Sequence, residues 1–160
     1  MGIVVPIIFR SAENVDVPSM AAIRAKESGG EALWVDRIGR YLSGAHSPQQ
    51  ALPERAAYVA VHEHRIVGFV AGHRTRRFDC DGELQWINVV QEKRGQGIAA
   101  RLLVEIGSWF VQHNACRVCV NVEPANQAAR RVYARCGAQR LNEYWMIWED
   151  AWTMERPDSR

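Results

Sequence analysis

The spacing of hydrophobic and polar residues divides the chain into two halves. In the first half, apolar residues at helical spacing predict helices at 17–23 and 31–42, and short β-rich runs predict strands. The expected strands are 3–9, 58–61, 66–71 and 83–90, with a turn at 62–64 and polar loops at 43–53 and 75–82. This order is typical of an antiparallel meander with helices before it.

The second half alternates helix and strand. Apolar side chains between 98 and 110 share one helical face, residues 117–122 are β-rich, and residues 125–136 are helical again. Because two strands joined by a crossover helix are parallel, strands 83–90 and 117–122 are expected to lie side by side. The segment 140–149 is expected to close the sheet as one long strand or two short ones.

Length and composition fit one globular domain. The chain has 160 residues, of which 48% are hydrophobic and 24% charged. We therefore expect a single α+β domain over 1–160, whose last ~8 residues can form a tail outside the core. No uninterrupted apolar run approaches the roughly 20 residues of a membrane-spanning helix. The composition therefore predicts a soluble protein.

The charge balance argues against a nucleic acid or an anionic membrane as partner. Twenty basic and eighteen acidic residues give a net charge of +2, so any anion site must be local. The small number of cysteines and the absence of signal-peptide features at the N-terminus favour the cytoplasm. Cys116 and Cys119 have zinc-like spacing, but residues three apart on a strand point to opposite faces, so no metal site is expected.

The loop 91–99 lies between an expected strand and an expected helix. Gly95, Gly97 and Ala99 let the backbone approach a ligand closely, and the helix behind them supplies free amides and a positive dipole end. This arrangement predicts an anion cradle, most naturally for a pyrophosphate. Gly97 is followed by neither the lysine nor the hydroxyl of a nucleoside-triphosphate loop, and the three glycines and later acidic residue of a dinucleotide-binding fold are absent.

The same loop carries a resemblance to a known family. Arg94-x-x-Gly97-x-Ala99, after a strand ending in Val89-Val90, resembles the acyl-CoA-binding signature of the GNAT superfamily of N-acyltransferases. Ala99 stands where glycine is commoner in that pattern. The resemblance implies a cofactor, acetyl-CoA or a related acyl-CoA, whose pyrophosphate lies on the loop and whose pantetheine extends along strand 83–90.

A second stretch is similar to the later motif of that family. It reads Asn126-x-x-Ala129-x-x-x-Tyr133-x-x-x-Gly137, and Asn126, Ala129, Arg130 and Tyr133 share one stripe of a helix. The two motifs together imply a GNAT-type mixed, mostly antiparallel sheet of six to seven strands with a central parallel pair splayed apart, flanked by about four helices. The implied cofactor-binding residues are Asn88, Val89, Val90, Arg94, Gly95, Gln96, Gly97, Ile98, Ala99, Asn126, Ala129, Arg130 and Tyr133.

The chemistry that the resemblance implies is direct attack of an amine on the thioester in a ternary complex. A primary amine with a pKa of about 10.4 is almost wholly protonated at neutral pH, so a base is needed. Glu83 is the expected base, directly or through a water wire, with Asp81 as an alternative and a solvated strand end as the non-functional interpretation of Glu83. Val89 or Val90 would offer a backbone N–H to the oxyanion, and Tyr133 would protonate the leaving thiolate.

Acceptor recognition is expected from aromatic residues in the first helices and last strands. The candidates are Trp34, Tyr41, Tyr144 and Trp148. Trp145 and Trp148 fall on opposite faces of a closing strand, so one of them is expected in the core. Trp152, beyond the last strand, is expected to contact a second subunit in a homodimer.

Three kinds of function are considered. The leading hypothesis is an N-acetyltransferase that moves acetyl from acetyl-CoA to a primary amine of a small molecule or peptide. The alternative is a noncatalytic acyl-CoA-binding or sensing module, which would need no proton donor, and the presence of Tyr133 favours the enzyme. A nucleic-acid-binding module would rest only on the arginines at 74, 76 and 77.

Overall fold

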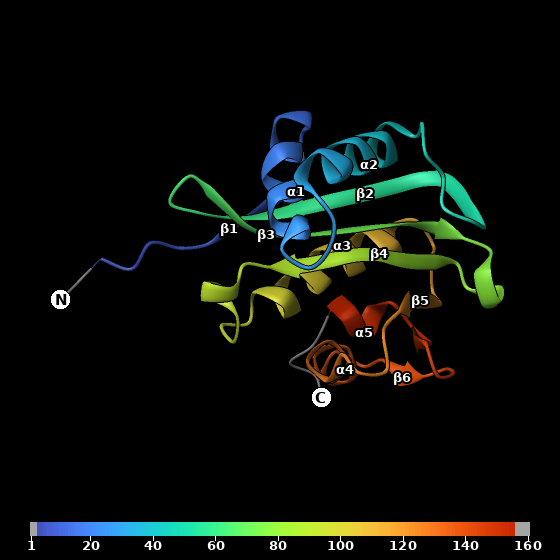
Figure 1. Cartoon of the computed structure of the whole chain (residues 1–160). Helices are drawn as coiled ribbons and strands as arrows, with labels where there is room; N and C mark the ends of the chain where they lie inside the picture. Colours follow the sequence, from blue (N-terminus) through green and yellow to red (C-terminus); the bar gives the residue numbers. More distant parts are fainter. Residues whose placement is uncertain (1–2, 156–160) are drawn as a thin grey trace.

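One seven-stranded sheet organises the chain in the computed structural model, which describes residues 3–155 (Figure 1). The strand order is β1-β2-β3-β4-β5-β7-β6, with β4 and β5 parallel and the other neighbours antiparallel. The strands are β1 (Ile8–Ser11), β2 (Ala51–His62), β3 (Arg65–Thr75), β4 (Gly82–Val89), β5 (Val118–Asn121), β6 (Gln139–Arg140) and β7 (Trp145–Trp148). The predicted mixed, mostly antiparallel α+β fold is confirmed.

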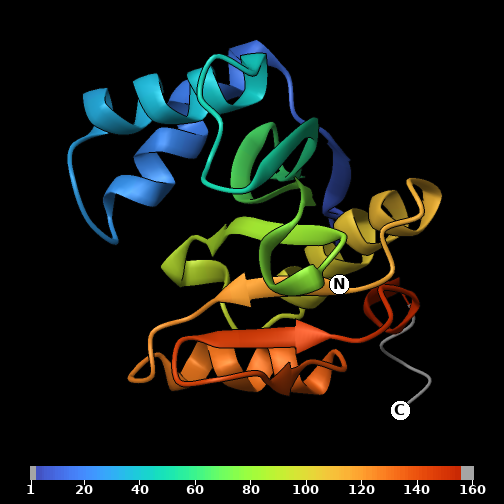
Figure 2. The same ribbon diagram turned by 90° about the vertical axis from the view of Figure 1, so that its right-hand side faces the viewer.

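The helices flank this sheet on both faces. They are α1 (Val17–Ala25), α2 (Glu31–Ser43), α3 (Ile98–Gln112), α4 (Gln127–Arg135) and the short α5 (Trp152–Glu155), with 3₁₀ turns at Asn14–Asp16, Arg77–Asp79 and Gln91–Lys93. Helices α1 and α2 pack together, and Figure 2 shows α4 beside β7, at the far end of the sheet from α1 and α2. The expected tail begins within α5, and its residues 156–160 lie outside the described part of the chain.

Several strand boundaries differ from the sequence prediction. The first strand begins at Ile8 rather than Ile3, because Pro6 offers no N–H to a strand ladder. β2 begins inside the expected loop 43–53, and its Pro53 lies within a register shift, where a missing donor is tolerated. The closing segment forms two short strands, β6 and β7, rather than one long strand.

Helix α3 covers the face of the sheet opposite to α1 and α2. The Phe110 ring of α3 lies directly against the strands. A side chain at Gly82 would lie 2.6 Å from Phe110, and one at Gly72 would lie 2.9 Å from the same ring. Phe110 is fully buried, so only glycine at these two positions lets α3 approach the strands. Among residues 3–155, no helix combines the length and the apolar character needed to cross a bilayer.

The parallel strands β4 and β5 separate soon after they meet. Their pairing covers only Gly82–Leu84 opposite Val118–Val120. Beyond it, Trp86 pairs with Ala71 while Leu84 pairs with Gly72 on β3, so Gln85 is the extra residue of a β-bulge. The rest of β4 therefore has a neighbour on its β3 side and an open edge toward β5.

Candidate active site

A groove of about 1380 Å³ occupies the gap between the separated strands. Glu83 at the start of β4 lies at one part of its wall, and the loop of Gly95 and Gly97 lies at another. Asn126, the N-cap of α4, and Tyr133 within α4 line the opposite side. The groove thus brings together both stretches that carry the sequence motifs.

Ten of the expected cofactor-binding residues line this groove. They are Asn88, Val89, Arg94, Gly95, Gly97, Ile98, Ala99, Asn126, Ala129 and Tyr133. Asn126 also caps α4, because its Oδ1 accepts from the Ala129 N–H at 3.1 Å. Capping and a position in the groove wall are therefore compatible in this residue.

The loop before α3 has the geometry of an anion cradle. Gly95 and Gly97 have φ angles of +79° and +82°, and an added Cβ at either would meet no atom within 4 Å. Gly97 is the N-cap of α3 and has no side chain to cap the first turn, so the amides there remain available to a ligand. Lys93 and Arg94 add positive charge to the same wall.

The open edge of β4 offers backbone groups to the groove. The Val90 N–H donates to the Val67 carbonyl at 2.9 Å. In an antiparallel pair only every second residue bonds to the neighbouring strand, so the residues next to Val90 in this alternation face the other way. Val89 and Ile87 consequently direct their N–H and C=O groups away from β3. The Val89 carbonyl accepts from Arg94 Nε at 3.0 Å, so the Val89 N–H and the groups of Ile87 are the ones left for a ligand. The expectation of Val90 as an oxyanion donor is wrong, because its N–H is already bonded to Val67. Val89 stays the candidate for that role.

Two other expected cofactor residues lie elsewhere. Gln96 is exposed and does not line the groove. Arg130 points to the chain segments around α4, where it donates to the carbonyls of Val122 at 3.3 Å and Glu143 at 2.6 Å. Its neighbour Arg131 lines the groove instead. The helical stripe predicted from the sequence placed Arg130 on the ligand side because it did not account for these loop carbonyls.

Tyr133 lies at the floor of the groove with its ring in the core. The ring is buried and packs edge-on against Trp148, with centroids 5.6 Å apart. Burial raises the pKa of the Tyr133 hydroxyl above its ordinary value, and the positive charge of Arg24 opposes that rise in part. The hydroxyl makes no hydrogen bond to any residue in 3–155, and it remains a protonated donor at neutral pH.

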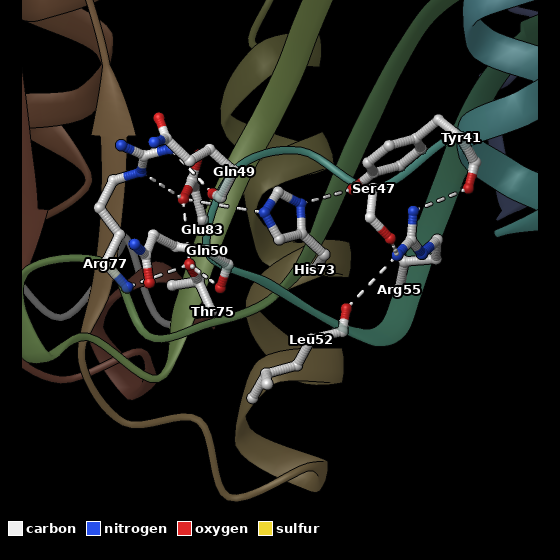
Figure 3. Close-up of polar contacts among 10 residues, drawn as sticks. All are labelled: Tyr41, Ser47, Gln49, Gln50, Leu52, Arg55, His73, Thr75, Arg77 and Glu83. Carbon is white, nitrogen blue, oxygen red and sulfur yellow. Dashed lines mark hydrogen bonds and ion pairs between the residues drawn. The ribbon is translucent and has the colours of Figure 1, made fainter. Parts of the chain in front are cut away.

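Glu83 is buried, so the interpretation as a solvated strand end is wrong. Its Oε1 accepts from Arg77 Nε at 3.0 Å and from Thr75 Oγ1 at 3.2 Å, and His73 Nε2 lies 3.7 Å from the same atom (Figure 3). Burial raises the pKa of Glu83, but His73 and Arg77 lower it by more, so its pKa lies below the ordinary value. Glu83 is therefore a carboxylate at neutral pH.

His73 was not predicted as part of the site. It is fully buried, and its Nδ1 lies 2.8 Å from the hydroxyl of Tyr41, which comes from α2. Its Nε2 faces Glu83 and has no hydrogen-bond partner among the described residues. Figure 3 shows the imidazole between Glu83 and Tyr41. His73 reaches Glu83 because the two residues are paired across β3 and β4. That strand register cannot be read from the sequence, so the contact was not predictable.

Asp81, the alternative base, has a structural position. Its Oδ2 accepts from the backbone N–H groups of Cys116 at 3.1 Å and Arg117 at 3.0 Å. These bonds tie the start of β4 to the segment that leads into β5. The side chain does not line the groove, so this alternative is corrected.

The expected acceptor aromatics do not line the groove. Trp148 is fully buried and donates from Nε1 to the Cys136 carbonyl at 3.0 Å, so it is a core residue. Tyr41 is fully buried, Trp34 is only 6% exposed, and Tyr144 is exposed but lies outside the groove wall. Trp148, Tyr41 and Trp34 are corrected as direct acceptor contacts, because they are buried. Tyr144 stays a prediction.

One tryptophan that the sequence analysis did not select does line the groove. Trp86 on β4 contacts Tyr41 and Trp34, with ring centroids 5.0 and 5.9 Å away. The bulge at Gln85 changes which face of β4 the following residues occupy, so simple alternation from Glu83 would have placed Trp86 wrongly. Trp34 and Tyr41 thus support the wall residue rather than form the wall.

Trp145 and Trp148 lie on opposite faces of β7 and one of them is in the core, as expected. Trp148 packs in the core beside α4, while Trp145 lies on the other face, 5.1 Å from Phe78 between ring centroids. Trp152 is 44% exposed on α5. Its role in a homodimer remains a prediction.

Comparisons with known proteins agree with this geometry. The model of the Acetyltransferase (GNAT) family matches residues 27–138. An uncharacterized N-acetyltransferase from Mycobacterium tuberculosis is 33% identical over 109 residues, which cover 61% of this chain and 69% of that protein.

Solved structures of acetyltransferases have the same fold at low identity. The PaiA N-acetyltransferase of Thermoplasma acidophilum, in complex with coenzyme A, superposes with a TM-score of 0.67 at 14% identity, covering 89% of this chain and 98% of that one. A chimera of the Vibrio cholerae spermidine N-acetyltransferase SpeG with hSSAT gives a TM-score of 0.66 at 16% identity, covering 92% and 97%.

Proposed function

Because the chain belongs to the GNAT family of acetyltransferases, we propose that it transfers acetyl from acetyl-CoA to a primary amine of a small molecule or peptide by direct attack in a ternary complex. The observation that carries the proposal is the single groove that holds the glycine loop, the open edge of β4 and the Tyr133 side chain. A site of this kind binds an extended cofactor at one end and an acceptor at the other.

The residues present fit a coenzyme A molecule. Gly95 and Gly97 leave open space where a Cβ would stand, beside the first amides of α3, which suits a pyrophosphate. The β4 edge at Ile87 would pair with amides of the pantetheine, because the Val89 carbonyl already accepts from Arg94 Nε at 3.0 Å. Arg131 would meet a phosphate from the α4 side. When bound, acetyl-CoA supplies a thioester that is activated toward nucleophiles.

Three groups of this chain would handle charge and protons. The Val89 N–H would stabilise negative charge on the carbonyl oxygen, since it points away from β3 and Val89 lines the groove. Tyr133 would donate its proton to the departing sulfur, because its raised pKa keeps it protonated. Glu83 would attract the acceptor ammonium and take up its proton through water, because the residue lines the groove and its carboxylate is ionised at neutral pH.

The noncatalytic alternative predicts cofactor binding without turnover. It needs the glycine loop but has no use for a protonated tyrosine in the groove. Tyr133 lines the groove, which favours the enzyme.

The cofactor part of the proposal can be tested with a matched pair of glycine variants. Gly97 and Gly44 have φ angles of +82° and +83°, and neither has an atom within 4 Å of an added Cβ. Gly97→Ala and Gly44→Ala should therefore each lose about 1–2 kcal/mol of stability. Only Gly97→Ala should also lose acetyl-CoA affinity, by about tenfold or more, because its methyl group would stand in the cradle.

Calorimetric titration with acetyl-CoA measures the affinities, and thiol release with a panel of amines measures turnover. Absence of acetyl-CoA binding by the wild type would overturn the cofactor assignment. Tight binding without thiol release from any amine would favour the noncatalytic alternative.

A further inference from the structure

Arg24 is a half-buried cation in the wall of the groove. It lies in the last turn of α1 and its guanidinium stacks on Trp34, with Cζ 4.9 Å from the ring centroid. Its Nη1 donates to Asn88 Oδ1 at 3.3 Å. Two neighbours from α2 and β4 therefore hold the guanidinium in one orientation at the groove.

The charge of Arg24 has no ion-pair partner within the described chain. No carboxylate of residues 3–155 lies within ion-pair distance of it, and the nearby Glu27 pairs with Arg94 at 3.0 Å. The Arg24 Nε is buried and has no hydrogen-bond partner among the same residues. The charge of Glu27 acts on Arg24 only from beyond ion-pair distance, so the guanidinium keeps hydrogen-bond donors for an anionic ligand.

The position of Arg24 identifies the ligand to which that anion belongs. Asn88 lies on β4 one residue before Val89, the proposed oxyanion donor, and not in the glycine loop. Arg24 and Tyr133 line the same groove and are close enough for the charge of one to affect the other. An anion on Arg24 would therefore lie beside the reacting centre, on the acceptor rather than on the cofactor phosphates.

We propose that Arg24 binds a carboxylate of the acceptor, so that the substrate is an amine with a carboxylate a few bonds from the reacting nitrogen, as in an α-amino acid. This inference rests on the proposed acetyl transfer. A guanidinium can donate two parallel hydrogen bonds to one carboxylate. Because Asn88 accepts from Arg24 through Oδ1, its Nδ2 is available as a further donor to the same group.

The rest of the wall fits such a molecule. Trp86 offers an apolar surface to the carbon skeleton, and the Glu83 carboxylate attracts the ammonium group. A guanidinium beside the thioester repels acceptors with several positive charges and no carboxylate. The groove is thus expected to prefer amino acids over polyamines.

Thiol release should be measured with α-amino acids, with the corresponding α-amino amides, and with dipeptides whose second residue is acidic or neutral. The wild type should prefer each acid over its amide by about tenfold or more in kcat/KM. A preference for acidic dipeptides over free amino acids would assign the carboxylate to a peptide side chain instead. Absence of any preference for a carboxylate would overturn the proposal.

Arg37 provides a matched control, because its guanidinium also stacks on Trp34, at 5.4 Å, but is exposed and outside the groove wall. Arg24→Gln should lose the preference for acids through a higher KM, Arg24→Lys should keep part of it, and Arg37→Gln should keep it all. Affinity for acetyl-CoA should stay unchanged in all three.

Other results would separate the possible failures. Equal losses of kcat with acids and amides in Arg24→Gln would assign Arg24 to the thioester and refute acceptor binding. A large loss of acetyl-CoA affinity in Arg24→Gln would assign it to the cofactor. Failure of the wild type to bind acetyl-CoA would instead refute the proposed function. If Arg24→Gln does not fold, Arg24→Lys and the wild-type comparison of acids with amides still decide the question.

Discussion

The carboxylate of Glu83 and the imidazole of His73 face each other inside the protein, with Oε1 3.7 Å from Nε2. The two residues are direct neighbours across the antiparallel pair β3 and β4. Tyr41 holds the other nitrogen of the imidazole at 2.8 Å. A groove residue is thereby connected to a polar chain that runs under α2, away from solvent.

The pH dependence of stability should reveal Glu83. Its pKa is lowered in the folded protein, because the effect of His73 and Arg77 exceeds that of burial. The unfolded chain therefore binds this proton more tightly, so Glu83 stabilises the fold above about pH 4.3 and loses that contribution as the pH falls toward its folded pKa. Glu83→Gln should cost about 1.5–3 kcal/mol at pH 7, and its difference from wild type should shrink below about pH 4.3.

Urea unfolding between pH 7 and pH 3 measures this difference. Glu31→Gln on the exposed surface of α2 is the control and should change stability by less than about 0.5 kcal/mol. A constant difference between Glu83→Gln and wild type across the pH range would contradict the prediction.

The hydroxyl of Tyr41 should matter for stability rather than for acceptor contact. Tyr41→Phe keeps the ring against Trp86 but leaves the buried His73 Nδ1 unpaired, at a cost of about 1–3 kcal/mol. Tyr58→Phe is the control, because Tyr58 is half-buried and its hydroxyl makes no hydrogen bond within residues 3–155. Equal stability of the two variants in urea unfolding would count against the buried network.

Removal of the Tyr133 hydroxyl should separate turnover from binding. Tyr133→Phe should lower kcat by about 10²-fold or more if the hydroxyl protonates the leaving sulfur. Stability and acetyl-CoA affinity should change little, since no residue in 3–155 hydrogen-bonds that hydroxyl. Single-turnover thiol release measures the chemical step, and an unchanged rate would remove Tyr133 from the mechanism.

The neighbouring residues Arg130 and Arg131 should behave differently. Arg131→Ala should weaken acetyl-CoA binding by about two- to fivefold, and more at low ionic strength, because its exposed charge lines the groove. Arg130→Ala should lower the unfolding midpoint instead, since it releases the carbonyls of Val122 and Glu143. Titration calorimetry and thermal unfolding of both variants provide the comparison. The reverse assignment would return Arg130 to the cofactor site.

Trp148 should act as a core residue. Trp148→Phe leaves a cavity beside Tyr133 and removes the bond to the Cys136 carbonyl, so about 2 kcal/mol of stability should be lost. Trp152→Phe on the exposed surface of α5 should cost less than about 0.5 kcal/mol. Denaturant unfolding tests both. A stable Trp148→Phe with an altered acceptor KM would restore Trp148 to the acceptor site.

Local sequence patterns were sufficient to predict much of the fold. The helix 31–42 and the turn at 62–64 follow from short-range spacing, and Glu63 and His64 do adopt the positive φ angles of a tight hairpin turn. The crossover between two β-rich segments predicted the parallel pair, because that connection has one favoured arrangement. Strand lengths were less predictable, since β2 extends through polar residues that pair only because β3 lies beside them.

The candidate site also combines features that depend on local sequence with features that depend on long-range contacts. The cradle of Gly95 and Gly97 and the alignment of Asn126 with Tyr133 could be predicted from the sequence, because backbone conformation and helical period are local properties. Three other features could be found only in the folded chain: His73 faces Glu83, Trp86 lines the groove, and Arg24 lies in the groove wall without an ion-pair partner. These features depend on strand register, on the bulge at Gln85 and on burial, all of which arise from contacts between residues far apart along the chain.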